Sequence, residues 1–265
     1  MRFYTEYIKA TFYQGLTYRF DYFMWLVGTF FSLFVRYFIW RSLLGQQEVF
    51  TDYGIISFSQ MSTYIILSSI VSTLLSSDVI GGMAEKIKTG QIAMDMIKPV
   101  NIKGLFFCAS ISMNLYKCLF HLLPVAIVSI IAFGISIPPI FSAVCSIVAL
   151  LNGVILYFFV GYVLGVLGFW FTQVWILGRF LSDFVWLFAG SIIPLWFFPQ
   201  WLQTISLFLP FRLIYFTPIS IYMNMYNIPE AIWLVGQQFL WMIGLYCLGR
   251  FTWSRGIYKL VVLGG

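Results

Sequence analysis

Charged residues are scarce in this sequence. Asp, Glu, Lys and Arg together make up 9% of its 265 residues, whereas about 25% is usual for a soluble domain. Hydrophobic residues make up 61% of the chain, and no soluble fold of this length could hide so much apolar surface from water. The alternating segments of a transmembrane β-barrel are also missing. The predicted fold class is therefore an all-α polytopic membrane protein, with residues 1–265 forming a single transmembrane domain.

Groups that carry enzyme chemistry are scarce as well. The sequence has one histidine, His121, no H-E-x-x-H motif and no carboxylates paired at catalytic spacing. It has no G-x-x-x-x-G-K-[ST] phosphate-binding loop, and its four cysteines have neither metal-ligand nor disulfide spacing. We therefore predict that this chain is not an enzyme and holds no metal and no cofactor of its own.

Long apolar runs are abundant. A helix needs about 20 apolar residues to span a bilayer. Six runs approach or exceed this length, at about residues 22–44, 56–77, 105–133, 141–169, 181–193 and 231–253. The fifth is too short to cross unless it begins earlier, so we expect a start near Trp175. The fourth carries Gly161, Gly165 and Gly168, and small residues at such spacing let a neighbouring helix approach closely.

Residues 1–19 have a mixed pattern. Apolar positions such as Tyr7, Ile8 and Phe12 recur at helical spacing, while Glu6 and Lys9 fall on another face. The pattern predicts an amphipathic helix that lies along the inner membrane surface. The alternative is a simple anchor that flanks the first span.

One long polar stretch, residues 78–103, interrupts the apolar runs after the second span. It contains four lysines and three acidic residues: Lys86, Lys88, Lys98, Lys103, Asp78, Glu85 and Asp95. Gly81-Gly82 predicts a helix break, and Gly90 predicts the end of a short helix over residues 83–89. Pro99 bars a helix from continuing through it and suits the first turn of the next helix.

A second interruption follows the fifth run, in residues 194–229. It holds five of the nine prolines: Pro194, Pro199, Pro210, Pro218 and Pro229. Prolines this frequent are incompatible with one straight span, although the stretch is apolar. We expect it to enter the membrane from the outer side as short re-entrant helices whose freed backbone groups are buried in protein or face water.

The basic residues predict the orientation. Six spans place both termini on one side, and most basic residues gather on that side: Arg2, Lys9, Arg19, Lys86, Lys88, Lys98, Lys103, Arg179, Arg250, Arg255 and Lys259. Basic loops remain in the cytoplasm, so we expect both termini there. Arg212 is then the basic residue of the outer loops.

One polar constellation lies inside the third span. Its members are spaced four, three and four residues apart and share one helix face: Ser110, Asn114, Lys117 and His121. An ionisable residue inside a span is costly and indicates function. Asp183 on the fifth span is a candidate counter-ion for Lys117, with Arg179 as an alternative partner for that carboxylate. Two interpretations remain open: a polar lining of a translocation path, or a structural network between helices.

Residues 84–101, AEKIKTGQIAMDMIKPVN, resemble the cytoplasmic loop of ABC-2 type permeases. In that family an acidic-basic pair, a glycine, an apolar helix and a Pro-Val step follow in this order, as in Glu85-Lys86, Gly90, residues 92–97 and Pro99-Val100. Residues 192–218 are similar to the family's re-entrant helices between its last two spans. The chain departs from the family at Lys88-Thr89, where a second acidic residue often precedes the glycine.

The resemblance implies a fold like that of the ABC-2, or type V, exporters. It implies six transmembrane helices, an N-terminal interfacial helix, a coupling helix between spans two and three, and a re-entrant segment on the outer side. Contact with an ATPase is expected from Glu85, Lys86, Ile87, Lys88, Gly90, Ile92, Asp95 and Pro99. The translocation path is expected to include Asn114, Lys117, His121 and Asp183. The re-entrant segment is expected to include Pro194, Pro199, Pro210, Arg212 and Pro218.

The function that the resemblance implies is that of the permease subunit of an ATP-driven exporter. Its partners would be two copies of a separate ATP-binding subunit, which carries the ATP and Mg²⁺, and a second permease chain, identical or similar. Members of the family export drugs, peptides, polysaccharides or lipid-linked glycans. We expect a multi-pass protein of the cell (plasma) membrane, in bacteria the inner membrane. The alternatives are a secondary transporter or channel, and a membrane-embedded enzyme or scaffold.

Overall fold

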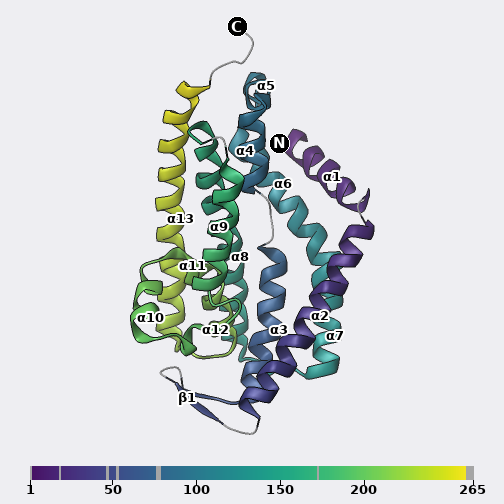
Figure 1. The fold of residues 1–265 in the computed structure, drawn as a ribbon, viewed down its shortest axis with the longest axis vertical. Helices are drawn as coiled ribbons and strands as arrows, with labels where there is room; N and C mark the ends of the chain where they lie inside the picture. The colour runs from purple at the N-terminus through teal and green to yellow at the C-terminus, as the bar shows by residue number, and fades with distance from the viewer. Residues whose placement is uncertain are drawn as a thin grey trace.

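The structure is a computed structural model and describes residues 2–17, 19–45, 48–51, 54–75, 79–171 and 173–260. Long helices dominate these residues (Figure 1). The longer helices are α1 (Arg2–Thr17), α2 (Arg19–Leu44), α3 (Phe58–Leu74), α6 (Ile102–Lys117), α7 (Leu123–Phe133), α8 (Ile140–Val166), α9 (Val174–Phe188) and α13 (Ile228–Gly256). The shorter elements are β1 (Val49–Thr51), β2 (Gly54–Ile56), α4 (Val79–Lys88), α5 (Gln91–Ile97), η1 (Cys118–Leu122), η2 (Leu167–Phe169), η3 (Leu195–Phe197), α10 (Gln200–Leu207), α11 (Pro210–Ile214), α12 (Phe216–Tyr222) and η4 (Ile257–Lys259).

Local sequence signals explain where several of these helices begin. Ser57 caps α3 and Asn227 caps α13, each accepting a hydrogen bond from the backbone N–H three residues later, at Gln60 and Glu230. The side chains of Gln60 and Glu230 accept the N–H of the capping residue in return. Asn101 caps α6 in the same way with one bond, from the Gly104 N–H. These bonds satisfy backbone donors that a helix start leaves free.

Within the described residues, five stretches are long and apolar enough to cross a membrane: Phe20–Leu44, Phe58–Lys88, Ile102–Phe133, Ile140–Phe169 and Ile228–Lys259. The expected fifth span differs, because α9 has only 15 residues. At 1.5 Å per residue it is about 22 Å long, shorter than the roughly 30 Å of bilayer hydrocarbon. In Figure 1, α9 descends beside α8 and the short helices α10–α12 lie below it. The expected fifth span is therefore not a helix of spanning length.

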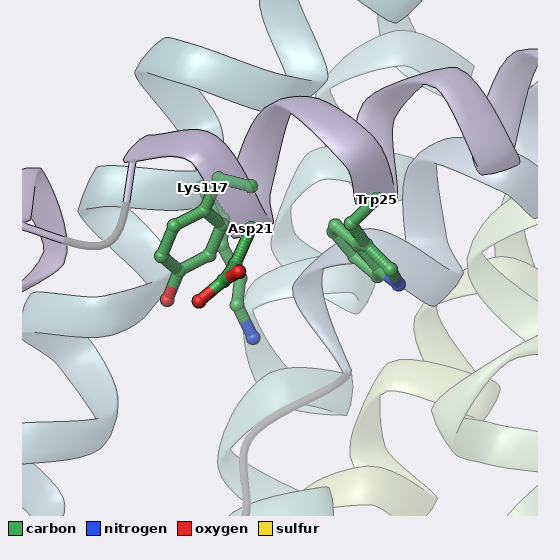
Figure 2. Close-up of a pocket in the computed structure, with 4 residues that line it drawn as sticks. Asp21, Trp25 and Lys117 are labelled. Atoms are coloured by element: carbon green, nitrogen blue, oxygen red, sulfur yellow. The ribbon is translucent and has the colours of Figure 1, made fainter.

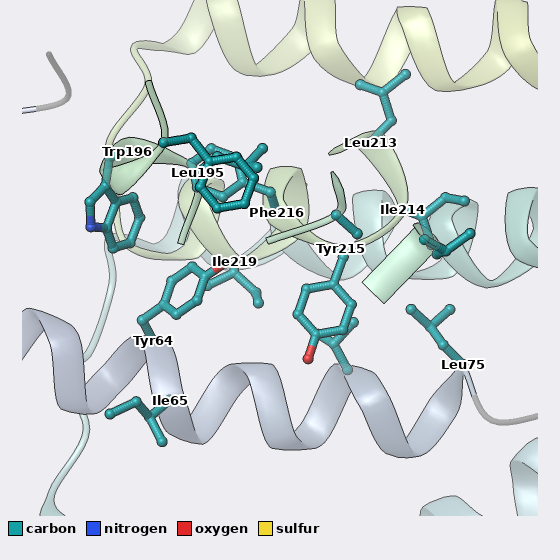
Figure 3. Close-up of a cluster of buried hydrophobic side chains, with 14 of the residues drawn as sticks. Tyr64, Ile65, Leu75, Leu195, Trp196, Leu213, Ile214, Tyr215, Phe216 and Ile219 are labelled. Atoms are coloured by element: carbon teal, nitrogen blue, oxygen red, sulfur yellow. The ribbon is translucent and has the colours of Figure 1, made fainter. Parts of the chain in front are cut away.

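The segment from α10 to α12, residues 200–222, supplies much of the core. Figure 3 shows its buried side chains facing α3. The Tyr64 hydroxyl of α3 donates to the Gly190 carbonyl oxygen over 2.6 Å, and the Tyr215 hydroxyl donates to the Ser68 carbonyl oxygen. The Tyr64 ring lies 4.8 Å from the Trp196 ring in an edge-on arrangement, which is a favourable geometry for an aromatic pair.

Prolines divide this segment as the sequence predicts. Pro199 directly precedes α10, Pro210 is the first residue of α11, and Pro218 lies in the first turn of α12. Pro194 precedes η3 in the same manner. Proline suits a first turn because its missing N–H has no helical partner there.

Arg212 does not lie in an open outer loop, as the sequence suggested. It belongs to α11 and is buried, and its guanidinium donates to the Tyr226 hydroxyl over 2.9 Å. Its Nε has no partner within the structure. The sequence could not show this burial because α11 packs against elements far from it in the chain, α8 above all.

The N-terminal helix is confirmed as α1, and it packs on α6 (Figure 1). The Ser112 hydroxyl donates to the Ile8 carbonyl oxygen over 2.6 Å. The Asn101 N–H donates to the Tyr4 hydroxyl over 3.1 Å. These bonds attach α1 to the third span, while its position on a membrane surface stays a prediction.

Candidate functional site

The polar stretch after α3 folds into two short helices, α4 and α5, which we call the α4–α5 hairpin (residues 79–97). Asp78, the first residue of the expected loop, lies outside the described residues. The hairpin stands at the end of the bundle near the start of α1 and the end of α13 (Figure 1).

The glycines of α8 hold α4 at close range. A Cβ on Gly165 would lie 2.7 Å from Met83 Cβ, and one on Gly161 would lie 3.3 Å from Val79 Cβ. A Cβ on Gly168, one turn further, would meet Ile87 Cδ1 at 3.3 Å. The prediction of a close helix contact along these glycines is confirmed. Its partner is the first helix of the hairpin.

The predicted helix break at Gly81-Gly82 is wrong. Helix α4 begins at Val79 and continues through both glycines to Lys88. A glycine inside a helix costs about 1 kcal/mol relative to alanine, and packing against α8 outweighs such local preferences.

Gly90 ends this helix and starts the turn to α5. Its φ is +73°, a conformation that glycine adopts without the strain of other residues. The predicted terminator is thus confirmed. The chain then enters α5, where Ile92 is buried against the cluster that contains Met83. Ile92 therefore holds α5 to its own chain and is not available to a partner. Pro99 lies exposed between α5 and α6 and not in the first turn of α6, which begins only at Ile102 after the Asn101 cap, so that prediction is wrong.

Asp95 connects the two helices of the hairpin electrostatically. Its carboxylate accepts from Lys86 Nζ on α4 and from Lys98 Nζ, each over 2.7 Å. Burial alone would raise the pKa of Asp95, but the hydrogen bonds and charges of Lys86 and Lys98 outweigh it and lower the pKa below its usual 3.8. The pair Lys86–Asp95 therefore fixes the geometry of the hairpin.

The outer face of the hairpin is apolar with charged residues beside it. Met94 and Ile97 are 66% and 78% exposed, and Met96 is also exposed. Glu85 and Lys88 are exposed on α4. An apolar centre with a charged rim is typical of a surface that binds another protein. We call Met94, Met96 and Ile97 the hairpin tip.

The polar residues of the third span meet α2. Lys117 is 5% exposed at the end of α6, and His121 is buried in η1, a π-helical turn that joins α6 to α7. His121 Nε2 lies 3.1 Å from Thr29 Oγ1, and its ring centroid lies 4.1 Å from that of Trp25. Lys117 Nζ lies 5.9 Å from the centroid of the Trp25 ring. A π-turn inside a helix is frequent at functional sites.

A cavity of about 360 Å³ opens beside Lys117. Asp21, Tyr22 and Trp25 of α2 line it together with Lys117. Figure 2 shows the Lys117 side chain and the Asp21 carboxylate directed toward the same space. Asn114 is near this cluster in the sequence, and its buried amide oxygen has no hydrogen-bond partner among the residues that the structure describes.

Asp183, the candidate counter-ion of Lys117, is exposed on α9, which packs against α4, α8 and α11. Its pairing with Lys117 stays a prediction. The acid that shares the cavity with Lys117 is Asp21. Its place at the start of the first span was visible in the sequence, but which helices become neighbours was not.

Long apolar helices around one core, with a charged hairpin at one end, define a multi-pass membrane protein. The model of the family described as ABC-2 family transporter protein matches residues 30–264. Because this match covers most of the sequence, the chain belongs to the ABC-2 transporter family and is a membrane component of a transporter. A comparison with curated proteins finds no match.

Proposed function

We propose that this chain is the permease subunit of an ATP-driven exporter and that the α4–α5 hairpin docks on a separate ATP-binding subunit. The observation that carries this proposal is the contrast within the hairpin. Its inner side is fixed to α8 by Met83, Ile92 and the glycines, while its tip exposes Met94 and Ile97. An element that transmits movement needs both a firm attachment and a surface for its partner.

The attachment explains how movement would reach the membrane. Helix α4 contacts α8, η2 and α9, and α8 packs along α13. Since packed helices transmit strain with little compression, a displacement of the hairpin would shift the α8–α13 pair as a unit. The Lys86–Asp95 bond keeps α4 and α5 from separating under such a load.

The translocation path would run beside the polar face of the third span. Asn114, Lys117 and His121 share this face. The carboxylate that lines the cavity together with Lys117 is that of Asp21. A second permease chain would complete the path, since Asp183 is exposed and free to face such a chain. Buried ionisable residues of this kind mark pathways in many membrane proteins.

One preparation tests the docking claim. The chain is co-expressed with its ATPase, and the ATPase retained during purification is measured for Met94→Asp and Ile97→Asp. Truncating or charging a central apolar contact weakens an interface by about 2 kcal/mol or more, or roughly 30-fold. Lys259→Glu, an exposed change at the same end of the bundle, is the control. Normal ATPase retention in both tip variants would contradict the proposal.

The same preparation tests the path. Lys117→Met keeps the length of the side chain and removes its charge. We expect retention of the ATPase with loss of most transport in proteoliposomes. Unchanged transport would remove Lys117 from the path, and loss of assembly would assign it a structural role.

A further inference from the structure

A second cavity lies near the start of α6 and the later turns of α8 and α13, and it shares Met96 with the hairpin tip. Its volume is about 390 Å³. The first turn of α6, the later turns of α8 and the end of α13 enclose it, together with residues after α5. Its lining residues are Met96, Val100, Asn101, Ile102, Lys103, Tyr162, Tyr246, Arg250, Trp253 and Ile257.

The charge of this cavity is positive. Lys103 and Arg250 contribute two cations, none of the described lining residues is acidic, and neither cation forms an ion pair among the described residues. The start of α6 also lines the cavity, at Ile102 and Lys103. The N–H groups of a first helical turn have no partners within the helix and form the positive end of its dipole.

Aromatic rings hold the lysine in place. Lys103 Nζ lies 4.0 Å from the centroid of the Tyr246 ring and 5.1 Å from that of Tyr162. The Tyr162 ring is 2% exposed and stacks on Trp253. Its hydroxyl has no hydrogen-bond partner within the described part of the chain and can donate to a bound group. The rings of Tyr162 and Tyr246 thus hold the Lys103 ammonium group at the cavity, and the side chain does not extend freely into water.

The cavity also lies at a defined depth. Lys103 is the second residue of its candidate span, and Tyr162 and Arg250 lie about two turns before the ends of theirs, which at 30 and 32 residues are longer than the hydrocarbon layer requires. The ends of spanning helices meet the headgroup layer of the bilayer, where Tyr and Trp are enriched. Basic pockets between spans at this depth suit phospholipid headgroups.

From this arrangement we infer that the cavity binds the phosphate of an anionic phospholipid, with Arg250 and Lys103 as its ligands. The planar guanidinium of Arg250 can hold two phosphate oxygens at once. The ammonium group of Lys103, held against the two tyrosine rings, adds a second positive charge. The acyl chains would lie along the apolar surface of α13, where Ile243 and Phe239 are exposed. Such a lipid would bridge α6 and α13 at the end where the hairpin stands.

The test measures lipid retained by the purified transporter. Phosphatidylglycerol is titrated into the detergent-solubilised full-length chain with its partners, and binding is followed by native mass spectrometry. We expect the double variant Lys103→Gln with Arg250→Gln to bind phosphatidylglycerol about 30-fold more weakly. This is the loss of affinity expected when two basic residues near an anionic lipid lose their charge. Lys103→Gln alone should bind phosphatidylglycerol more weakly than the unchanged chain, whereas Lys103→Arg keeps the charge and should retain most of the binding.

The matched control is Arg255→Gln, an exposed arginine five residues further along α13 that does not line the cavity. It should bind the lipid like the unchanged chain. An equal loss in the control and in the double variant, or no loss in either, would overturn the assignment. Inorganic phosphate is titrated in parallel. If free phosphate competes at concentrations comparable to those of the lipid, the site serves a soluble anion and the lipid assignment is wrong.

Discussion

The α4–α5 hairpin and the α10–α12 segment both interrupt the spanning helices, but they dispose their apolar side chains in opposite ways. In the α10–α12 segment Ile214 and Phe216 are fully buried against the chain's own helices. At the hairpin tip Met94 and Ile97 are exposed. The α10–α12 segment completes the fold, whereas the α4–α5 hairpin is attached to the fold and leaves apolar side chains exposed.

The largest effect should come from the buried interruption. Phe216→Ala leaves a cavity in the core of Figure 3, and deleting a buried Phe side chain costs about 3–5 kcal/mol. Phe208→Ala removes the same side chain from a position that is 75% exposed on the turn after α10, and we expect almost no change. Thermal unfolding in detergent measures both. Equal melting temperatures for the two variants would contradict the assignment of this segment to the core.

A smaller effect should follow from a methyl group at the contact between α4 and α8. Gly165→Ala places its Cβ against Met83 and should destabilise the chain by about 1–3 kcal/mol, as overpacking does elsewhere. Gly244→Ala on α13 meets nothing within 4 Å, so it should be neutral or slightly stabilising. ATP hydrolysis stimulated by the permease should also fall in Gly165→Ala, because the hairpin no longer seats on α8. Identical behaviour of the two variants would exclude the close contact.

The sequence reveals some features of the fold and hides others. The close face at Gly161 and Gly165, the turn at Gly90 and the proline breaks follow from local rules, because backbone freedom and side-chain size are properties of single residues. The helix through Gly81-Gly82 and the burial of Arg212 depend on packing with distant elements, which no local pattern encodes.

The candidate sites show the same limit. The polar face at Lys117 and His121 was visible as a spacing. Its carboxylate neighbour was not, because Asp21 and Asp183 are equally plausible until the helices are placed. Likewise the hairpin's charges were evident in the sequence. The ion pair between Lys86 and Asp95 and the exposure of Met94 and Ile97 became visible only in the folded hairpin.

The smallest effect concerns the charge pairing inside the hairpin. Because the pKa of Asp95 is lowered in the folded chain, its stabilisation is present above its usual pKa of 3.8 and is lost as the pH falls through the lowered value. Asp95→Asn should therefore lower stability by about 1 kcal/mol at pH 7 and converge with the unchanged chain at strongly acidic pH. Unfolding as a function of pH measures this difference. A gap that persists at the most acidic pH would contradict the pairing.

The most direct measurement compares the two interruptions in one cross-linking experiment. A single cysteine is placed at Ile97 or at Phe208, both exposed, in a chain whose four native cysteines are replaced by serine. A bifunctional thiol reagent is then applied to the complex with its ATPase. We expect a permease–ATPase product from Ile97→Cys and none from Phe208→Cys. A product from Phe208→Cys alone would show that the hairpin tip is not the docking surface.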